Sequence, residues 1–320
     1  MDAKPGLLDH PLRWRTGLGL LIALVLLPTL AHAWGQEFYV GVASRFLIFA
    51  LAATSLNLIL GFGGMVSFGH AAFVGVGAYA AGILMQHGLP SAWLALALAF
   101  VTAGAFALLI GAISLRTRGV YFIMITLAFA QMLYYLMVSV KTYGGDDGLS
   151  LSGRFDPGFN LDLSQDATFY YLVLTLVVAV FLGVQRLLNS RFGHALQAIR
   201  DNETRMAAIG FPVYRFKLVA FVLAGALAGL AGALLAHQGG FVSPSMMQWS
   251  ESGMLMVMVI LGGVGQLYGG LVGAVVFLAL EELLSSFTIH WQFGLGAVLL
   301  AVVLLAPNGL LSLRLKRETP

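Results

Sequence analysis

Residues able to do chemistry are few in this chain, and they lie in three places. Polar and basic side chains gather in residues 186–217, which hold six of the seventeen lysines and arginines. His70 lies in a glycine-rich stretch, residues 57–82, and Glu281 and Glu282 lie within an apolar run. No cluster of histidine and carboxylates, and no nucleophile beside a base, has the spacing that catalysis requires. We therefore predict no catalytic residue, and since cysteine is absent we predict neither disulfides nor a thiolate metal site.

Composition identifies an integral membrane protein. Of the 320 residues, 59% are hydrophobic and 10% are charged, whereas about 25% of a soluble domain is charged. Apolar runs of about eighteen residues or more recur along the chain, and the alternating polarity of a membrane barrel is missing. The net charge of +3 is small and lies beside the apolar runs, so it indicates orientation in a lipid bilayer and not binding of nucleic acid.

The predicted fold is a single all-α transmembrane domain, residues 1–320, with about ten spanning helices. The spans are expected at 17–34, 40–60, 67–87, 91–114, 119–140, 168–186, 217–237, 252–265, 269–286 and 291–307. With the N-terminus inside, 14 of the 17 basic residues lie at the inner face, which favours cytoplasmic positions for both termini. The first apolar run is long for a signal peptide, and we expect it to be retained as a span.

The basic stretch 186–217 is predicted to form a cytoplasmic loop with a short helix at 193–208. Gly210 and Pro212 should end that helix. Its spacing places four apolar residues on one face: Ala195, Leu196, Ile199 and Met206. Such a helix suits docking to a soluble partner, with Ala195, Leu196 and Ile199 as anchors and Arg200 and Glu203 at the rim. The alternative is an ordinary arginine-rich inner loop.

Two glycine-rich stretches are expected to shape the two ends of the protein. The outer segment 141–167 should be a periplasmic loop, with tight turns at 142–148 and a solvated part at 155–167. At the inner face, glycines interrupt two spans around residue 61. Broken helices of this kind line the path of many transporters. The residues predicted to do so here are Asn57, Gly61, Gly64, Ser67 and His70.

His70 has three possible roles: a ligand, a proton relay, or a hydrogen-bonded packing residue, which we favour because no partner for the ring is evident. Residues 261–273 match 60–72 at a constant offset of 201, through Leu60, Gly61, Gly64 and Gly69. The match has two possible explanations. The chain could consist of two structurally related halves, or two glycine-rich stretches could agree by chance. Arg45 could extend toward the outer face, while Glu281 and Glu282 could face an aqueous cavity or pair with another subunit.

Three motifs resemble the LivM-type permease subunits of branched-chain amino acid importers. Ser55–Tyr79 resembles the family's SLNLLxGxxGxxSxGHAAFxGxGAY stretch, and Thr142–Leu149 resembles its TGGxxGL pattern with Tyr143 inserted. The third motif resembles the loop that meets the ATPase. Its matching residues are Gly193, Ala195, Leu196, Ala198, Ile199, Arg200, Asn202, Glu203 and Gly210.

This resemblance implies a fold of the type II ABC importer kind, in a multi-pass protein of the bacterial inner membrane. It implies four kinds of partner: a sister permease of LivH type, two cytoplasmic ATPases that use ATP and Mg²⁺, a periplasmic binding protein, and the lipid bilayer. It assigns the chain itself no cofactor. Thr142, Gly144, Gly145 and Gly148 would form the outer mouth. Transport of urea or short amides by the same kind of permease is an alternative, and a stand-alone carrier or channel is another.

Overall fold

The computed structural model describes residues 14–33, 35, 38–151, 153, 155–156, 158, 163, 165–287, 289–306 and 309–311, and it is helical nearly throughout. The α-helices within this part of the chain are α1 (Trp14–Ala33), α2 (Phe38–Asn57), α3 (His70–Gln86), α4 (Ala92–Ser114), α5 (Val120–Ser139), α6 (Asp166–Leu188), α7 (Arg191–Asp201), α8 (Glu203–Ala208), α9 (Val213–Gly239), α10 (Trp249–Gly262), α11 (Gly269–Phe287) and α12 (Trp291–Leu305). The basic termini used for the orientation argument, residues 1–13 and 312–320, lie outside the described residues.

Short elements complete the description. A π-helix, η1 (Leu58–Phe62), continues α2, and three 3₁₀ turns are η2 (Lys141–Tyr143), η3 (Gly145–Asp147) and η4 (Pro244–Met247). Two strands, β1 (Leu149–Ser150) and β2 (Phe241–Val242), pair antiparallel, with Leu149 opposite Val242. The all-α prediction missed this pairing, because a two-residue strand is too short to show alternation.

Six helices are long and apolar enough to cross a membrane: α2 with η1 (Phe38–Phe62), α4, α5, α6, α9 and α11. Four shorter helices, α1, α3, α10 and α12, are also apolar. Each predicted span coincides with one of these ten helices to within four residues at either end. The largest deviations have local causes. α3 begins at His70 because residues 65–69 are non-helical, and α9 begins at Val213, directly after Pro212.

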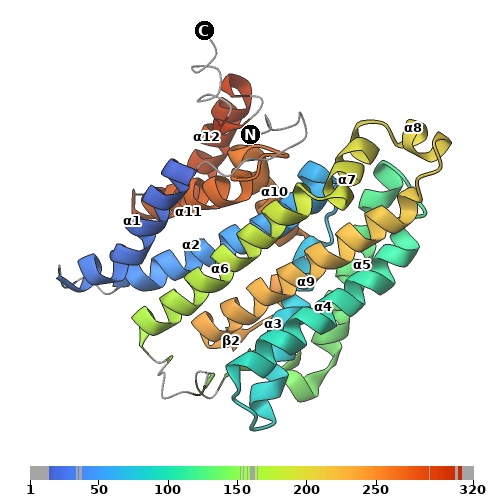
Figure 1. The fold of residues 1–320 in the computed structure, drawn as a ribbon. Helices are drawn as coiled ribbons and strands as arrows, with labels where there is room; N and C mark the ends of the chain where they lie inside the picture. The colour runs from blue at the N-terminus through green and yellow to red at the C-terminus, as the bar shows by residue number, and fades with distance from the viewer. Residues whose placement is uncertain are drawn as a thin grey trace.

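The helices form a tilted bundle, and the axes of five of them are inclined in a similar way: α2, α4, α5, α6 and α9 (Figure 1). α9 packs along α3 and α4, and α11 packs along α2. Small residues permit the close approach, since a Cβ added to Gly77 would overlap the backbone of Gly229, and one added to Gly232 would overlap that of Val74. Gly229 and Gly232 of α9 therefore serve helix packing.

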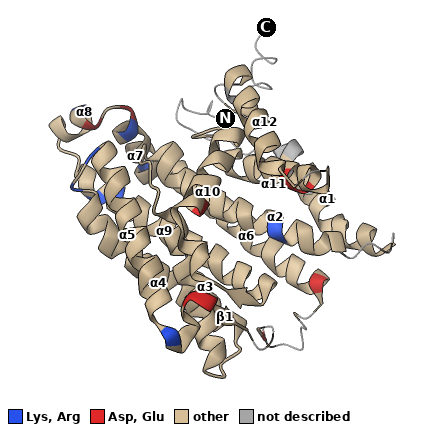
Figure 2. Ribbon diagram, turned by 180° about the vertical axis from the view of Figure 1, so that it is seen from behind, with Lys and Arg blue, Asp and Glu red and all other residues tan. Residues whose placement is uncertain are grey.

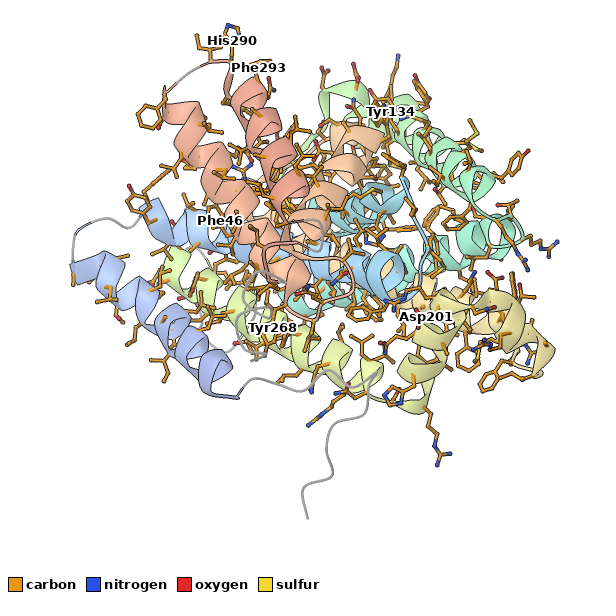
Figure 3. The ribbon with its side chains drawn as sticks, turned by 90° about the horizontal axis from the view of Figure 1, so that it is seen from above. Phe46, Tyr134, Asp201, Tyr268, His290 and Phe293 are labelled. Carbon is orange, nitrogen blue, oxygen red and sulfur yellow. The ribbon has the colours of Figure 1, made fainter. Side chains whose placement is uncertain are left out.

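The two ends of the bundle differ in character. α7 and α8 project at one end, while β1, β2 and the adjoining turns lie at the other (Figure 1). Basic residues surround the α7–α8 end, and few charges are visible along the long helices (Figure 2). His290 in the α11–α12 turn and Phe293 in the first turn of α12 lie far from Asp201 at the end of α7 (Figure 3). This distribution agrees with a cytoplasmic position for α7 and α8.

Candidate functional site

The basic stretch forms two helices where one was predicted. α7 ends at Asp201, and Asn202 is extended (φ −155°, ψ 92°) and starts α8, because its side-chain oxygen accepts a hydrogen bond from the Arg205 amide at 2.9 Å. Asparagine is a strong N-cap, and capping separates the two helices. The prediction of a continuous helix from 193 to 208 is therefore wrong at Asn202. We name α7, α8 and the residues as far as Pro212 the α7–α8 projection.

The apolar face of α7 packs on the chain's own helices. Leu196 and Ile199 are 0% and 1% exposed, and Ala195 is also buried. Gly193 contacts the end of α6 so closely that a Cβ would overlap the Leu188 carbonyl. The expectation that Ala195, Leu196 and Ile199 anchor a partner is thus wrong, since burial leaves them no free surface. Ala198 is only partly buried, and it packs against the cluster of Ala195, Ile199 and Met206.

The surface that α7 and α8 leave free lies at the tip of the projection. Ile209 is 64% exposed and Phe211 is 39% exposed. Ala207, Ala208 and Gly210 are exposed beside them, and Gly210 adopts φ +88° to turn the chain. The sequence identified Gly210 as a helix stop, but it did not single out the apolar residues on either side. The pattern that could have identified Ile209 and Phe211 is a pair of large apolar residues on either side of a helix-ending glycine in a basic loop.

Arg200 joins the projection to the interrupted end of α2. Its Nη1 donates a hydrogen bond to the Gly61 carbonyl oxygen at 2.8 Å, while Nε and Nη2 bind Asp201 Oδ1 at 3.0 and 2.8 Å. Its aliphatic part crosses Gly64, where an added Cβ would lie 2.9 Å from Arg200 Cγ. Gly64 has φ +67°, which favours glycine. The predicted polar rim residue is therefore an internal contact of the protein.

Asn57 extends this contact to a second interrupted region. Its Nδ2 donates to the Gln266 carbonyl at 2.8 Å, and its Oδ1 accepts from the Gly265 amide at 3.1 Å. Gly61 lies against Gly265. At the sequence offset of 201, Gly265 corresponds to Gly64. The two residues have similar backbone φ angles, +74° and +67°. The sequence similarity of 60–72 and 261–273 thus has a conformational counterpart, and the two turns lie side by side.

Glu203 fixes the other side of the projection. Its carboxylate contacts Lys217 Nζ at 2.5 Å and Arg118 Nη2 at 3.2 Å. Lys217 belongs to α9, and Arg118 lies in the connection between α4 and α5. These residues and Gly64 line a cavity of about 180 Å³. Arg200 and Glu203 therefore connect the projection to η1, to α9 and to the α4–α5 connection.

The remaining residues predicted to line a path are buried in contacts between helices. His70 is fully buried, and its Nε2 lies 2.8 Å from Ser55 Oγ, whose hydroxyl also donates to the Ala52 carbonyl. Its ring meets Phe73 edge-on, with centroids 5.9 Å apart. Ser67 is also fully buried and accepts a hydrogen bond from the Gly69 amide. This environment agrees with the packing interpretation of His70.

The predicted tight turns at the outer end are present. Gly144, Gly145 and Gly148 adopt φ values of +92°, +54° and +80°. A Cβ at Gly144 would overlap the Gly148 carbonyl, and one at Gly148 would lie 2.5 Å from the Val242 carbonyl. Thr142 is exposed beside them. The glycines therefore fold the turn back so that β1 pairs with β2.

In an importer of the kind that the sequence resemblance implies, we expect Gly144→Ala to weaken the response to a docked binding protein, because the methyl group cannot fit without opening the turn. Strain at such a position costs about 1–3 kcal/mol. ATP hydrolysis stimulated by loaded binding protein should fall, while basal hydrolysis stays unchanged. Gly153→Ala is the matched control, since that glycine has nothing within 4 Å of an added Cβ. Equal loss of both activities would show that the turn only supports folding.

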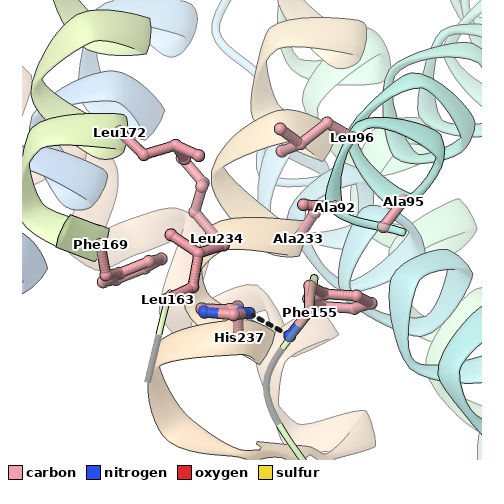
Figure 4. Close-up of a pocket in the computed structure, with 10 residues that line it drawn as sticks. All are labelled: Ala92, Ala95, Leu96, Phe155, Leu163, Phe169, Leu172, Ala233, Leu234 and His237. Carbon is pink, nitrogen blue, oxygen red and sulfur yellow. Dashed lines mark hydrogen bonds between the residues drawn. The ribbon is translucent and has the colours of Figure 1, made fainter. Parts of the chain in front are cut away.

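Part of the outer loop is buried, which corrects the prediction that 155–167 is solvated. Phe155 and Leu163 are each 4% exposed. The Phe155 amide donates to His237 Nδ1 at 3.1 Å, and that ring stacks between Phe155 and Phe169 (Figure 4). The cavity there is about 20 Å³, room for about one water molecule. His237 was missed because a single histidine at the end of an apolar run has no distinctive pattern.

The architecture is that of a transport subunit. Apolar helices carry the polar α7–α8 projection. Its contacts lead to two places where the helices of the bundle are interrupted, around Gly61 and around Gly265. Such interruptions are typical of transporters. The chain belongs to the family of permease components of branched-chain amino acid transport systems, which matches residues 38–307. Subunits of this family are non-catalytic transmembrane components of binding-protein-dependent ABC systems and carry no cofactor. This chain is accordingly a multi-pass membrane protein.

Three relatives illustrate the range of the similarity. The LivM permease of the high-affinity branched-chain amino acid transport system of Escherichia coli is 31% identical, over 90% of this chain and 74% of its own length. LivH of the same species is 26% identical, over 82% of this chain and 91% of its own. The xylose permease XylH of Haemophilus influenzae is 32% identical over 41% of this chain and 37% of its own. No solved structure matches the chain significantly.

Proposed function

We propose that this chain imports branched-chain amino acids as one of the two permease subunits that form the path across the membrane, and that partner subunits hydrolyse ATP. The partners are a sister permease of LivH type, two cytoplasmic ATPases and a periplasmic binding protein. Residues 1–320 would form one domain of the type II importer kind, with ten spans and both termini inside. Residues 186–217 would be the cytoplasmic coupling loop, and residues 141–167 the periplasmic loop.

One observation carries the mechanism, namely the hydrogen bond from Arg200 to the Gly61 carbonyl. An ATPase that moves the exposed tip of α8 would also move α7, because Met206 of α8 packs in one cluster with Ala195 and Ile199 of α7. Arg200 then transmits this displacement to η1, and Asn57 transmits it to the turn at Gly265. Both interrupted regions thus respond to one movement, and the inner end alternates between two packed arrangements.

The corrected docking surface follows from the same geometry. Ile209 and Phe211 would insert into the ATPase, because they are the large apolar groups that α8 and the following turn leave exposed. Four residues that the sequence predicts for coupling would hold the projection to the bundle: Gly193, Ala195, Leu196 and Ile199. Asn202 and Gly210 would shape its tip, and Arg200 and Glu203 would connect it to the helices. A small interface needs such a central apolar anchor.

Reconstitution tests this proposal and separates it from the alternatives. Proteoliposomes holding both permeases and both ATPases should take up labelled leucine only with ATP inside and binding protein outside. Uptake of urea or acetamide in place of leucine would favour the permease for short amides. Uptake by this chain alone, without ATP, would favour a stand-alone carrier and overturn the proposal.

A further inference from the structure

A second cavity, distinct from the contacts around Arg200, lies in the outer half of the bundle. It has a volume of about 360 Å³ and lies between α2, α3, α9, α10 and the β2–η4 segment. Its wall includes two charged residues, Arg45 and Glu251, and five large apolar residues: Phe49, Leu235, Phe241, Met246 and Leu255. Ligand sites for small molecules begin at about 300 Å³. The cavity is therefore large enough for one amino acid.

The charges beside this cavity are incompletely satisfied. Arg45 Nη2 lies 3.6 Å from Glu281 Oε1, which is longer than a hydrogen bond, and among the described residues no hydrogen bond of the Arg45 guanidinium occurs. Its carbon lies 5.7 Å from the centre of the Phe49 ring, which holds the group against the wall. Glu281 Oε2 is buried and has no hydrogen-bond partner in the described structure. The Arg45 guanidinium therefore keeps donors for a ligand, and the cavity wall adds the carboxylate of Glu251.

The location of these charges indicates a polar environment in the assembled transporter. Arg45 lies seven residues into α2, about 10 Å along the helix axis from Phe38. An arginine and two glutamates facing lipid at that depth would be costly, and intramembrane charges face protein or a water-filled cavity instead. The cavity therefore opens to an aqueous space or to a neighbouring subunit.

The chemistry of the wall selects among possible ligands. A free amino acid carries a carboxylate and an ammonium group, which complement a guanidinium and a carboxylate through charge-assisted hydrogen bonds. The apolar residues opposite would accept an aliphatic side chain. A sugar would need several neutral donors and acceptors, but Ser245 supplies the one neutral polar side chain among the lining residues.

We propose that this cavity is a substrate site within the permease, in which Arg45 binds the α-carboxylate and Glu251 the α-ammonium of the transported amino acid. The proposal rests on the proposed import function and adds residues that determine specificity. Binding would be weak, on the order of millimolar, because a site on a transport path must also release its ligand. Glu281, which is 3.6 Å from Arg45 and outside the cavity wall, would orient the guanidinium through this ion pair.

The absence of cysteine allows a direct test. Met246→Cys places one thiol on the cavity wall of the assembled complex, and its rate of labelling by a small maleimide is measured on this subunit without binding protein. L-Leucine at about ten times its dissociation constant should slow the labelling about tenfold, since only the empty fraction reacts. Leu89→Cys, at a position that is 51% exposed between α3 and α4 and outside the cavity wall, should label at the same rate with and without leucine.

Analogues and variants identify the groups involved. 4-Methylpentanoate, which lacks the amine, leucinamide, which lacks the carboxylate, and xylose should not protect the thiol. Glu251→Gln and Arg45→Gln should each weaken protection by leucine about tenfold or more, because a charged hydrogen bond is lost. Glu282→Gln, next to Glu281 but outside the cavity wall, should keep full protection. Copurification of the partner subunits shows that each variant is assembled.

Three results would overturn the proposal. One is unchanged labelling at all leucine concentrations in a complex that imports leucine, which would leave the proposed function intact. Another is equal protection by leucinamide or xylose. The third combines two observations: leucine does not protect the thiol in the parent protein, and the Glu251→Gln variant no longer copurifies with the sister permease. Arg45 and Glu251 would then be contacts between subunits. A complex that imports no leucine at all would instead contradict the proposed function.

Discussion

Ile209→Asp is expected to release the ATPase subunits from the permease and to reduce uptake about thirtyfold or more. Ile209 is 64% exposed at the tip of the α7–α8 projection, so the substitution removes little internal packing of the permease. In the assembled transporter the aspartate would be desolvated without a partner, and loss of an apolar anchor costs about 2 kcal/mol or more. Pull-down of the ATPases with tagged permease, together with leucine uptake, measures both effects.

The matched control is Ile289→Asp. Ile289 is 90% exposed at the other end of the bundle, so the same change of charge should leave ATPase copurification unaffected. If Ile209→Asp retains the ATPases and imports leucine at the parental rate, then the projection is only a connecting loop.

Arg200→Met is expected to leave the ATPases bound but to uncouple hydrolysis from transport. Methionine retains much of the aliphatic part that crosses Gly64, but it cannot donate to the Gly61 carbonyl. A hydrogen bond from a charged donor contributes about 1.5–3 kcal/mol. Leucine transported per ATP hydrolysed should therefore fall about tenfold or more, measured in proteoliposomes with both quantities followed in the same sample.

The control for this variant is Arg191→Met, an exposed arginine at the start of the same helix. It should transport the same amount per ATP as the parent protein. A proportional loss of uptake and hydrolysis in Arg200→Met would mean that fewer complexes assemble. Parental coupling would show that the bond to Gly61 transmits no movement.

The sequence predicted the helices well because each depends on a local property. An apolar run long enough for a span stays helical wherever its neighbours lie, and proline and glycine mark its ends. Gly144, Gly145 and Gly148 were expected in tight turns, and all three have positive φ. The split at Asn202 was also local, yet it was missed because an asparagine inside a helical pattern can either continue the helix or cap a new one.

The contacts of the candidate site could not be predicted, because they join residues far apart in the chain. Periodicity identified the apolar face of α7, but it could not show whether Leu196 and Ile199 pack on this protein or on a partner. The bond between Arg200 and Gly61 spans 139 residues and depends on how α7 lies against η1. Likewise, nothing local to Arg45 or Glu251 shows that both residues line one cavity.

The bonds of Asn57 also constrain the synthesis of the protein. Asn57 is buried, and its amide binds Gln266, which follows it by 209 residues. At 5–20 residues per second, a ribosome needs about 10–40 s to make the intervening chain. During that time the inner end of α2 lacks its final partner, so it can complete its structure only after α10 and the following turn have emerged.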